Sequence, residues 1–140
     1  MAARKKKSPT RAPGKRKKNP PVVMRVDVCG QTYEVVIDDV MELDGECDYS
    51  ANVIRLAPNA LWRMMDTLIH EVLHATLDAS NAARAMQRRL KMTEAQWRVF
   101  EEEFIVRPMT PALLATLKNA GMLRVPANMA KRAKGRRSSR

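Results

Sequence analysis

The chain has 140 residues, of which 45% are hydrophobic and 29% are charged, so it can form one small domain with its own core. Its net charge of +11 is concentrated at the two ends, with nine Lys or Arg residues and no acid in 1–21 and seven more in 122–140. The remaining 10 of the 26 basic residues stand against all 15 acids, so the middle of the chain is acidic by about five charges.

The cysteines and the hydropathy together indicate in which compartment the protein is expected. Cys29 and Cys47 form neither a disulfide framework nor a C-x-x-C pair, so we expect free thiols in a reducing environment. No apolar run approaches the roughly 18 residues of a membrane span. The basic N-terminus also lacks the apolar stretch of a signal peptide. We therefore expect a cytoplasmic protein without a membrane partner, and the sequence indicates no oligomeric state.

The two basic ends are expected to be tails. Residues 1–21 are rich in Lys, Arg and Pro and have almost nothing to bury, which predicts disorder. Residues 122–140 are interpreted in the same way. Two roles are equally consistent with this composition: a solubilising tail, or a non-specific contact with nucleic acid through phosphate neutralisation.

The strand signals precede the helix signals. Apolar residues alternate with polar ones in 22–29 and again in 32–37, around a turn at Gly30-Gln31, which predicts a β-hairpin. The acidic stretch 38–48 is expected to be loop, and 52–56 is expected to be a third strand.

Helices are expected in the second half. Asn59 is a candidate N-cap for a long helix whose apolar face comprises Leu61, Met64, Leu68, Val72 and Ala75. A short helix is expected at 83–90, and the capping-box pattern from Thr93 to Gln96 begins another, which Pro108 should end near Arg107. A last helix should run from Thr110-Pro111 to about 119–121. Strands followed by helices predict an α+β fold with a three-stranded sheet.

The run HEVLH carries the chemistry. Positions i and i+4 of a helix share a face, so His70 and His74 can present two imidazoles to one ion. Glu71 could then act as general base on a water held by that ion. The alternative is two surface histidines beside a solvated glutamate. Both histidines of the chain lie in this motif, a placement of ~1 in 1,000 for a shuffled chain, so we predict a Zn²⁺ site.

A catalytic zinc site needs a third protein ligand, which cannot be histidine here. The best source is WRVFEEEFIV, whose apolar side is formed by Trp97, Phe100, Phe104 and Ile105. Helical spacing puts Glu101 nearest the middle of that side, Glu102 at its border and Glu103 beyond it. At least one of the three should belong to a solvated face. Spacing alone favours Glu101, and Cys47 and Asp48 are weaker candidates.

After the hairpin, the segments GECDYSANVIRL, DTLIHEVLHATL and EEEFIVRPMTPALLATLKN resemble the small phage and prophage metallopeptidases related to the ImmA/IrrE group. The resemblance covers residues 22–121, and HEVLH is its only highly specific motif. It implies a zincin-like domain and a third ligand in a pattern like E-x-x-A. That pattern favours Glu102, with Ile105 where the family has Ala. The SprT-like group is similar too, but uses a later histidine that this chain lacks.

The resemblance also implies a function, namely zinc-dependent cleavage of a protein substrate in the cytoplasm of a bacterial host, for example a DNA-bound repressor. Strand 52–56 would hold an extended substrate, or be an ordinary strand of the sheet. Tyr49 and Arg55 are candidates for stabilising an oxyanion. The alternatives are a non-enzymatic nucleic-acid-associated protein with a structural metal domain and basic binding tails, and a domain that binds zinc without turnover.

Overall fold

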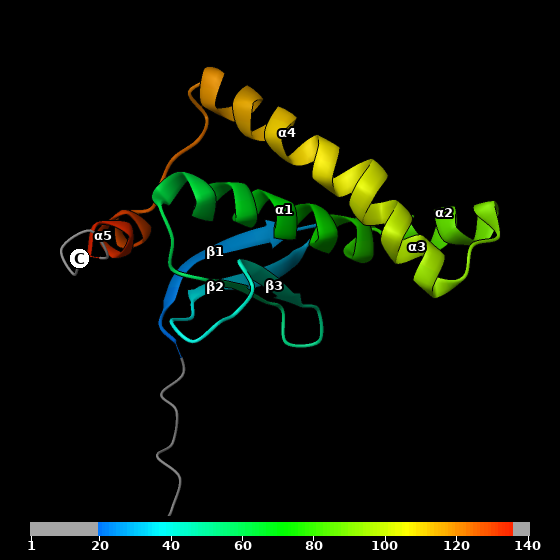
Figure 1. Ribbon diagram of the computed structural model, residues 1–140, viewed down its shortest axis with the longest axis horizontal. Helices are drawn as coiled ribbons and strands as arrows, with labels where there is room; N and C mark the ends of the chain where they lie inside the picture. Colours follow the sequence, from blue (N-terminus) through cyan, green and yellow to red (C-terminus); the bar gives the residue numbers. More distant parts are fainter. Residues whose placement is uncertain (1–19, 136–140) are drawn as a thin grey trace, which may run out of the picture.

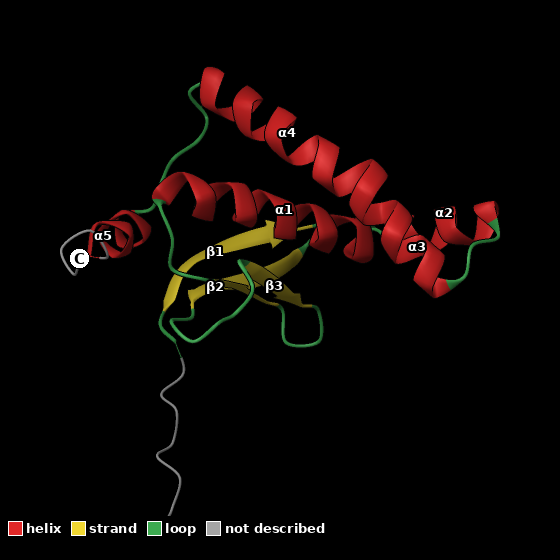
Figure 2. Ribbon diagram, viewed as in Figure 1, coloured by secondary structure: helices red, strands yellow, loops and turns green. Residues whose placement is uncertain are grey.

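The structure is a computed structural model that describes residues 20–135. It is an α+β fold in which helices cover one face of a sheet, as expected (Figure 1, Figure 2). In chain order the elements are β1 (Val22–Val28), β2 (Gln31–Ile37), β3 (Gly45–Asp48), β4 (Val53–Leu56), α1 (Leu61–Ala79), α2 (Ala82–Leu90), α3 (Glu94–Phe100), η1 (Glu101–Val106), α4 (Arg107–Asn119) and α5 (Ala127–Gly135). The predicted disorder of the N-terminal tail falls on residues outside those described.

The sheet is mixed, with strand order β1-β2-β4-β3. The predicted hairpin is formed by β1 and β2, and its turn consists of Cys29 and Gly30, one residue earlier than expected. Both turn residues have positive φ, +50° and +82°, as the tightest hairpin turns require. Gly30 adopts this conformation freely because it has no Cβ.

The prediction of three strands is wrong, because part of the acidic stretch forms a fourth strand. Strand β3 pairs antiparallel with β4, so that Cys47 lies opposite Ile54. The acids did not exclude a strand because Glu46 and Asp48 share one side of it, where the Arg55 guanidinium lies 3.7 and 3.9 Å from their carboxylates. An edge strand can expose such a polar side to water.

This fourth strand changes the role expected for 52–56. Strand β4 lies between β2 and β3, so both of its edges are paired within the sheet. The expectation that this segment holds a substrate by backbone pairing is therefore wrong. The outer edge belongs to β3, which also packs against α1.

Helix α1 covers the sheet and provides most of the helical part of the core. Its buried face includes Met64, Met65, Leu68, Ile69 and Ala75, and the sheet meets it with Tyr33, Val35, Ile37, Ile54 and Leu56. The expected N-cap was one residue too early, since Ala60 is the N-cap. The Asn59 side chain instead accepts a hydrogen bond from the Ala60 backbone N–H at 2.8 Å.

The capping box at Thr93 and Gln96 is confirmed, but the predicted end at Pro108 is wrong. Segments α3, η1 and α4 follow one another without a break and lie over α1 on the side away from the sheet (Figure 1). Segment η1 is a π-helical turn, in which the Arg107 backbone N–H donates to the Glu102 carbonyl, five residues earlier. Pro108 therefore does not end the helix but stands in the first turn of α4, directly after the π turn and inside a continuous helical stretch.

The C-terminal range expected to be a tail contains a packed helix. Helix α5 contacts α1 at the end opposite α2 and α3, and its Met129 is completely buried in the core (Figure 1). Its Arg132 lies 3.5 Å from the Asp39 carboxylate. The packed domain therefore continues past residue 121, and only 136–140 lie outside the described part at this end. Between residues 20 and 135 no helix has the length and apolarity to span a membrane.

Candidate metal centre

The two histidines of HEVLH lie one turn apart on the partly buried face of α1. Their side chains are 26% and 18% exposed. Their Nε2 atoms lie 3.3 Å apart, although each is four residues from the other along the chain. The i,i+4 spacing therefore brings two imidazole nitrogens to one point, as predicted.

Glu102 of η1 completes a group of three. Its Oε2 lies 3.2 Å from His74 Nε2 and 3.3 Å from His70 Nε2. Ligand atoms about 2.0–2.1 Å from a tetrahedral metal are about 3.3–3.4 Å from one another. The three atoms thus occupy three corners of a tetrahedron of the right size, and the His70, His74 and Glu102 group can hold a metal ion.

The pattern of protons supports the same conclusion. His74 Nδ1–H donates to Glu101 Oε1 at 2.8 Å, so in a neutral ring Nε2 carries a lone pair. That lone pair faces the Glu102 oxygen and the second imidazole. In the metal-free protein a proton on this nitrogen can bridge it to Glu102, because the pKa of His74 is raised by its neighbouring glutamates. A metal ion would contact all three atoms at once.

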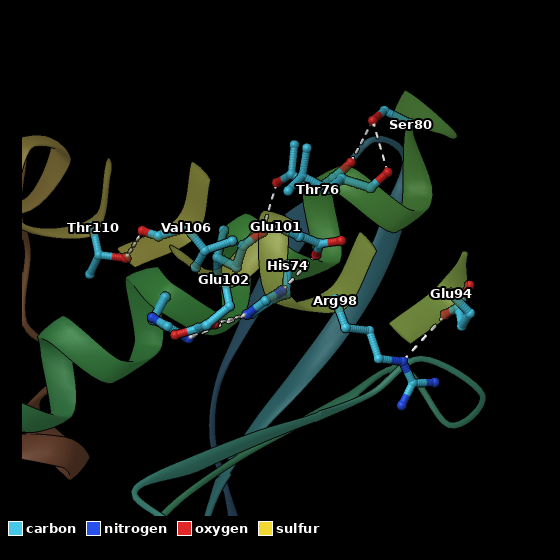
Figure 3. Close-up of polar contacts among 12 residues, drawn as sticks. His74, Thr76, Ser80, Glu94, Arg98, Glu101, Glu102, Val106 and Thr110 are labelled. Atoms are coloured by element: carbon cyan, nitrogen blue, oxygen red, sulfur yellow. Dashed lines mark hydrogen bonds and ion pairs between the residues drawn. The ribbon is translucent and has the colours of Figure 1, made fainter. Parts of the chain in front are cut away.

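Glu101 and Glu102 both contact His74, each at a different nitrogen of its ring (Figure 3). Glu102, the residue favoured by the resemblance, thus belongs to the group of three candidate ligands. The residue favoured by spacing, Glu101, is the more buried of the two at 13% against 30% exposure. It supports the histidine without facing the metal position, an arrangement common around zinc.

Glu71 lies on the side of α1 that packs against β3. It is the single buried charged residue in the described part of the chain, with 8% exposure. A Cβ atom added to Gly45 of β3 would stand 2.9 Å from Glu71 Oε1 and would also collide with the Thr67 methyl group. Gly45 therefore leaves the space that the Glu71 carboxylate occupies. This glycine lies in the acidic stretch 38–48, which the sequence predicted to be loop.

Burial changes the acid–base behaviour of the group. It raises the pKa of Glu71 above its ordinary value, although the nearby His74 opposes the shift. Burial also lowers the pKa of His70, against the charge of Glu102. For His74 burial alone would lower the pKa, but the hydrogen bond and charge of Glu101, together with the other glutamates, outweigh it and raise the pKa.

A cleft of about 620 Å³ opens beside this group, and its lining includes Tyr49, His74, Glu101 and Glu102. Tyr49 thus lies at the cleft, whereas Arg55 does not line it and is paired with Glu46 and Asp48.

The two weaker ligand candidates are not in the metal group. Burial, and then the charge of Glu71, raise the pKa of Cys47 to about 12 in the metal-free protein, and Cys47 is not part of the group of three candidate ligands. The Asp48 carboxylate accepts hydrogen bonds from Ser50 and Ala51. It therefore stabilises the turn after β3.

Comparisons of the chain with protein-family models, curated proteins and solved structures gave no match. The function is therefore inferred from the geometry of the site and from the resemblance noted in the sequence.

Proposed function

We propose that the protein is a zinc-dependent metallopeptidase, with His70, His74 and Glu102 as zinc ligands and Glu71 as general base. The observation that carries the proposal is the combination of a metal-sized triangle of ligand atoms with a buried glutamate next to it on the same helix. Three protein ligands leave one position of a tetrahedron open, which is typical of catalytic rather than structural zinc. The mixed N₂O donor set also suits zinc.

The residues of the chain divide the work of hydrolysis. Zinc, when bound, would supply a Lewis acid that polarises the scissile carbonyl and favours ionisation of a water. Glu71 takes the proton from the attacking water as the new C–O bond forms. It passes that proton to the amine nitrogen as the C–N bond breaks. Its raised pKa brings it closer to neutrality, where a group that both accepts and releases a proton works best.

A protein substrate has one free strand edge near this site. Strand β3 is at the edge of the sheet, packs against α1, and carries Gly45 beside Glu71. An extended peptide could pair with this edge and bring a peptide bond to the site. Tyr49, which follows β3 and lines the cleft, would be the donor available for an oxyanion. The cleft and the edge therefore favour an extended segment of protein as substrate.

The test compares wild type with Glu71→Gln after dialysis against zinc, using unfolded casein as substrate. We expect about one zinc per chain in both proteins and a loss of cleavage of at least about 100-fold in the variant. Glu34→Gln is a matched control, because Glu34 is partly exposed, pairs with Arg25 and does not line the cleft. The proposal is wrong if the folded wild type holds no zinc or if Glu71→Gln cleaves at the wild-type rate.

The concentration of basic residues at the two ends favours a second candidate, a nucleic-acid-associated protein with a structural metal domain. It predicts salt-sensitive binding to DNA or RNA that survives Glu71→Gln. That binding should disappear when 1–19 and 136–140 are removed together. The truncation must spare 127–135, because Met129 belongs to the core.

A further inference from the structure

The two oxygens of Glu102 have different surroundings. Oε2 faces the two histidine nitrogens at 3.2 and 3.3 Å. Oε1 lies 3.4 Å from Nη2 of Arg107, a residue that sequence reasoning did not single out. The same two residues are joined through the backbone, where Arg107 N–H donates to the Glu102 carbonyl and closes the π turn.

The guanidinium of Arg107 has a second anchor. Its Nη1 lies 2.8 Å from Glu103 Oε1. The guanidinium therefore lies between two neighbouring carboxylates, with a hydrogen bond to Glu103 and an ion pair with Glu102. Because Arg107 is 63% exposed, its ion pairs contribute little to folding stability. If replacing Arg107 strongly changes the metal centre, a loss of folding stability is therefore not the cause.

A carboxylate can bind a metal through one oxygen or through both. If Glu102 supplied both, its second oxygen would occupy the coordination position that a water or a substrate carbonyl needs. The positive guanidinium of Arg107, 3.4 Å from Oε1, attracts this oxygen and so competes with that second bond.

We propose that Arg107 is a positioning residue that confines Glu102 to metal binding through Oε2 alone and thereby keeps one coordination position open. The proposal rests on the metal site of the proposed function, but not on peptidase activity. The π turn is what makes it possible, since it brings Arg107 back beside Glu102 after five residues.

The test uses Co²⁺ in place of Zn²⁺, because the visible absorption of Co²⁺ reports its coordination number and geometry. At saturating Co²⁺ the wild-type protein should show the intense absorption of a four-coordinate site. Arg107→Met keeps much of the aliphatic stem but removes the donors. We expect several-fold weaker absorption per cobalt in this variant, the signature of higher coordination, with unchanged circular dichroism.

Two further variants separate positioning from folding. Arg107→Lys keeps a cationic donor and should restore much of the four-coordinate spectrum. Arg98→Met removes an exposed arginine that pairs with Glu94 on the same continuous helix, and it should leave the spectrum unchanged. An unchanged spectrum in both Arg107→Met and Arg107→Ala would overturn the inference. Failure of the wild type to bind Co²⁺ would instead contradict the proposed metal site itself.

Discussion

Glu101 accepts a hydrogen bond from His74 Nδ1 at 2.8 Å, although it is not one of the three residues whose atoms surround the metal position. This contact fixes the tautomer of His74 and so determines that Nε2 is the atom offered to a metal. The acidic run thus supplies both one of the three candidate ligand atoms and the support of a second.

We expect Glu101→Gln to weaken zinc binding by about tenfold and Glu101→Ala by up to about 100-fold. The amide of the first variant can still accept the His74 proton but has lost the charge. Affinity can be measured by competition with a chromophoric chelator. Glu94→Gln, an exposed glutamate of α3, is the control and should bind zinc as the wild type does.

Zinc affinity should fall as the pH is lowered, because protonation of His74 removes one of the candidate ligand atoms. Its pKa is raised in the metal-free protein, so a proton competes with the metal for this ring at and below near-neutral pH. The pKa of His70 is lowered, so protons compete less with the metal at this ring. Below the pKa of His74 we expect about tenfold weaker binding per pH unit. Glu101→Gln should move the onset of this decline to lower pH, and an unshifted onset would contradict the role of Glu101.

Gly45→Ala should be destabilising and should disturb Glu71. The new Cβ would meet Glu71 Oε1 at 2.9 Å and the Thr67 methyl group, so we expect a loss of about 1–3 kcal/mol in the free energy of unfolding. Urea denaturation measures this loss. Thr67→Ser removes the methyl group and should recover part of it in the double variant. No recovery would mean that the clash is not the cause.

The π turn makes a prediction about which apolar residues matter. Val106 is completely buried and Phe104 is 70% exposed, the reverse of what uninterrupted helical spacing predicts for Phe104. Val106→Ala should cost about 2 kcal/mol of unfolding free energy. Phe104→Ala loses the stacking of its ring on Phe100 and should cost about 1 kcal/mol. A larger loss for Phe104→Ala than for Val106→Ala would contradict the described register.

Helix α5 should behave as part of the domain. Met129→Ala removes a completely buried side chain and should cost about 2–5 kcal/mol of unfolding free energy. Met122→Ala, at a residue 70% exposed, should change it by less than about 0.5 kcal/mol. Thermal unfolding of the two variants compares them directly, and equal midpoints would argue against packing of α5.

Local signals predicted the elements that depend on local physics. Three such elements are the β1–β2 hairpin, the buried face of α1 and the Thr93 capping box. Each depends on residues that are close together in the sequence. Strand β3 was missed because its acidic side is tolerated only at a sheet edge, which the sequence does not reveal. Helix α5 was not predicted because the many basic residues of 122–140 indicated a tail, although Met129 among them packs into the core.

The third ligand illustrates the same limit. A regular period of 3.6 residues puts Phe104 inside, but the π turn adds one residue and rotates everything after Glu102. Spacing therefore identified Glu101, which is indeed the more buried glutamate, while the resemblance identified Glu102. Arg107 carried no signal in either, because its role depends on a five-residue hydrogen bond that no simple periodicity predicts.

Helix α2 has a consequence for how such a domain can diversify. None of its residues is buried, and it lies in the connection between His74 and Glu102, which are 28 residues apart in sequence but in contact in space. The packing of η1 and α4 on α1 keeps the two ends of that connection together. Mutations and length changes could therefore accumulate in α2 at little cost. Because Arg84 and Gln87 of α2 line the cleft, such changes would alter the lining of the cleft before they altered the three candidate ligands.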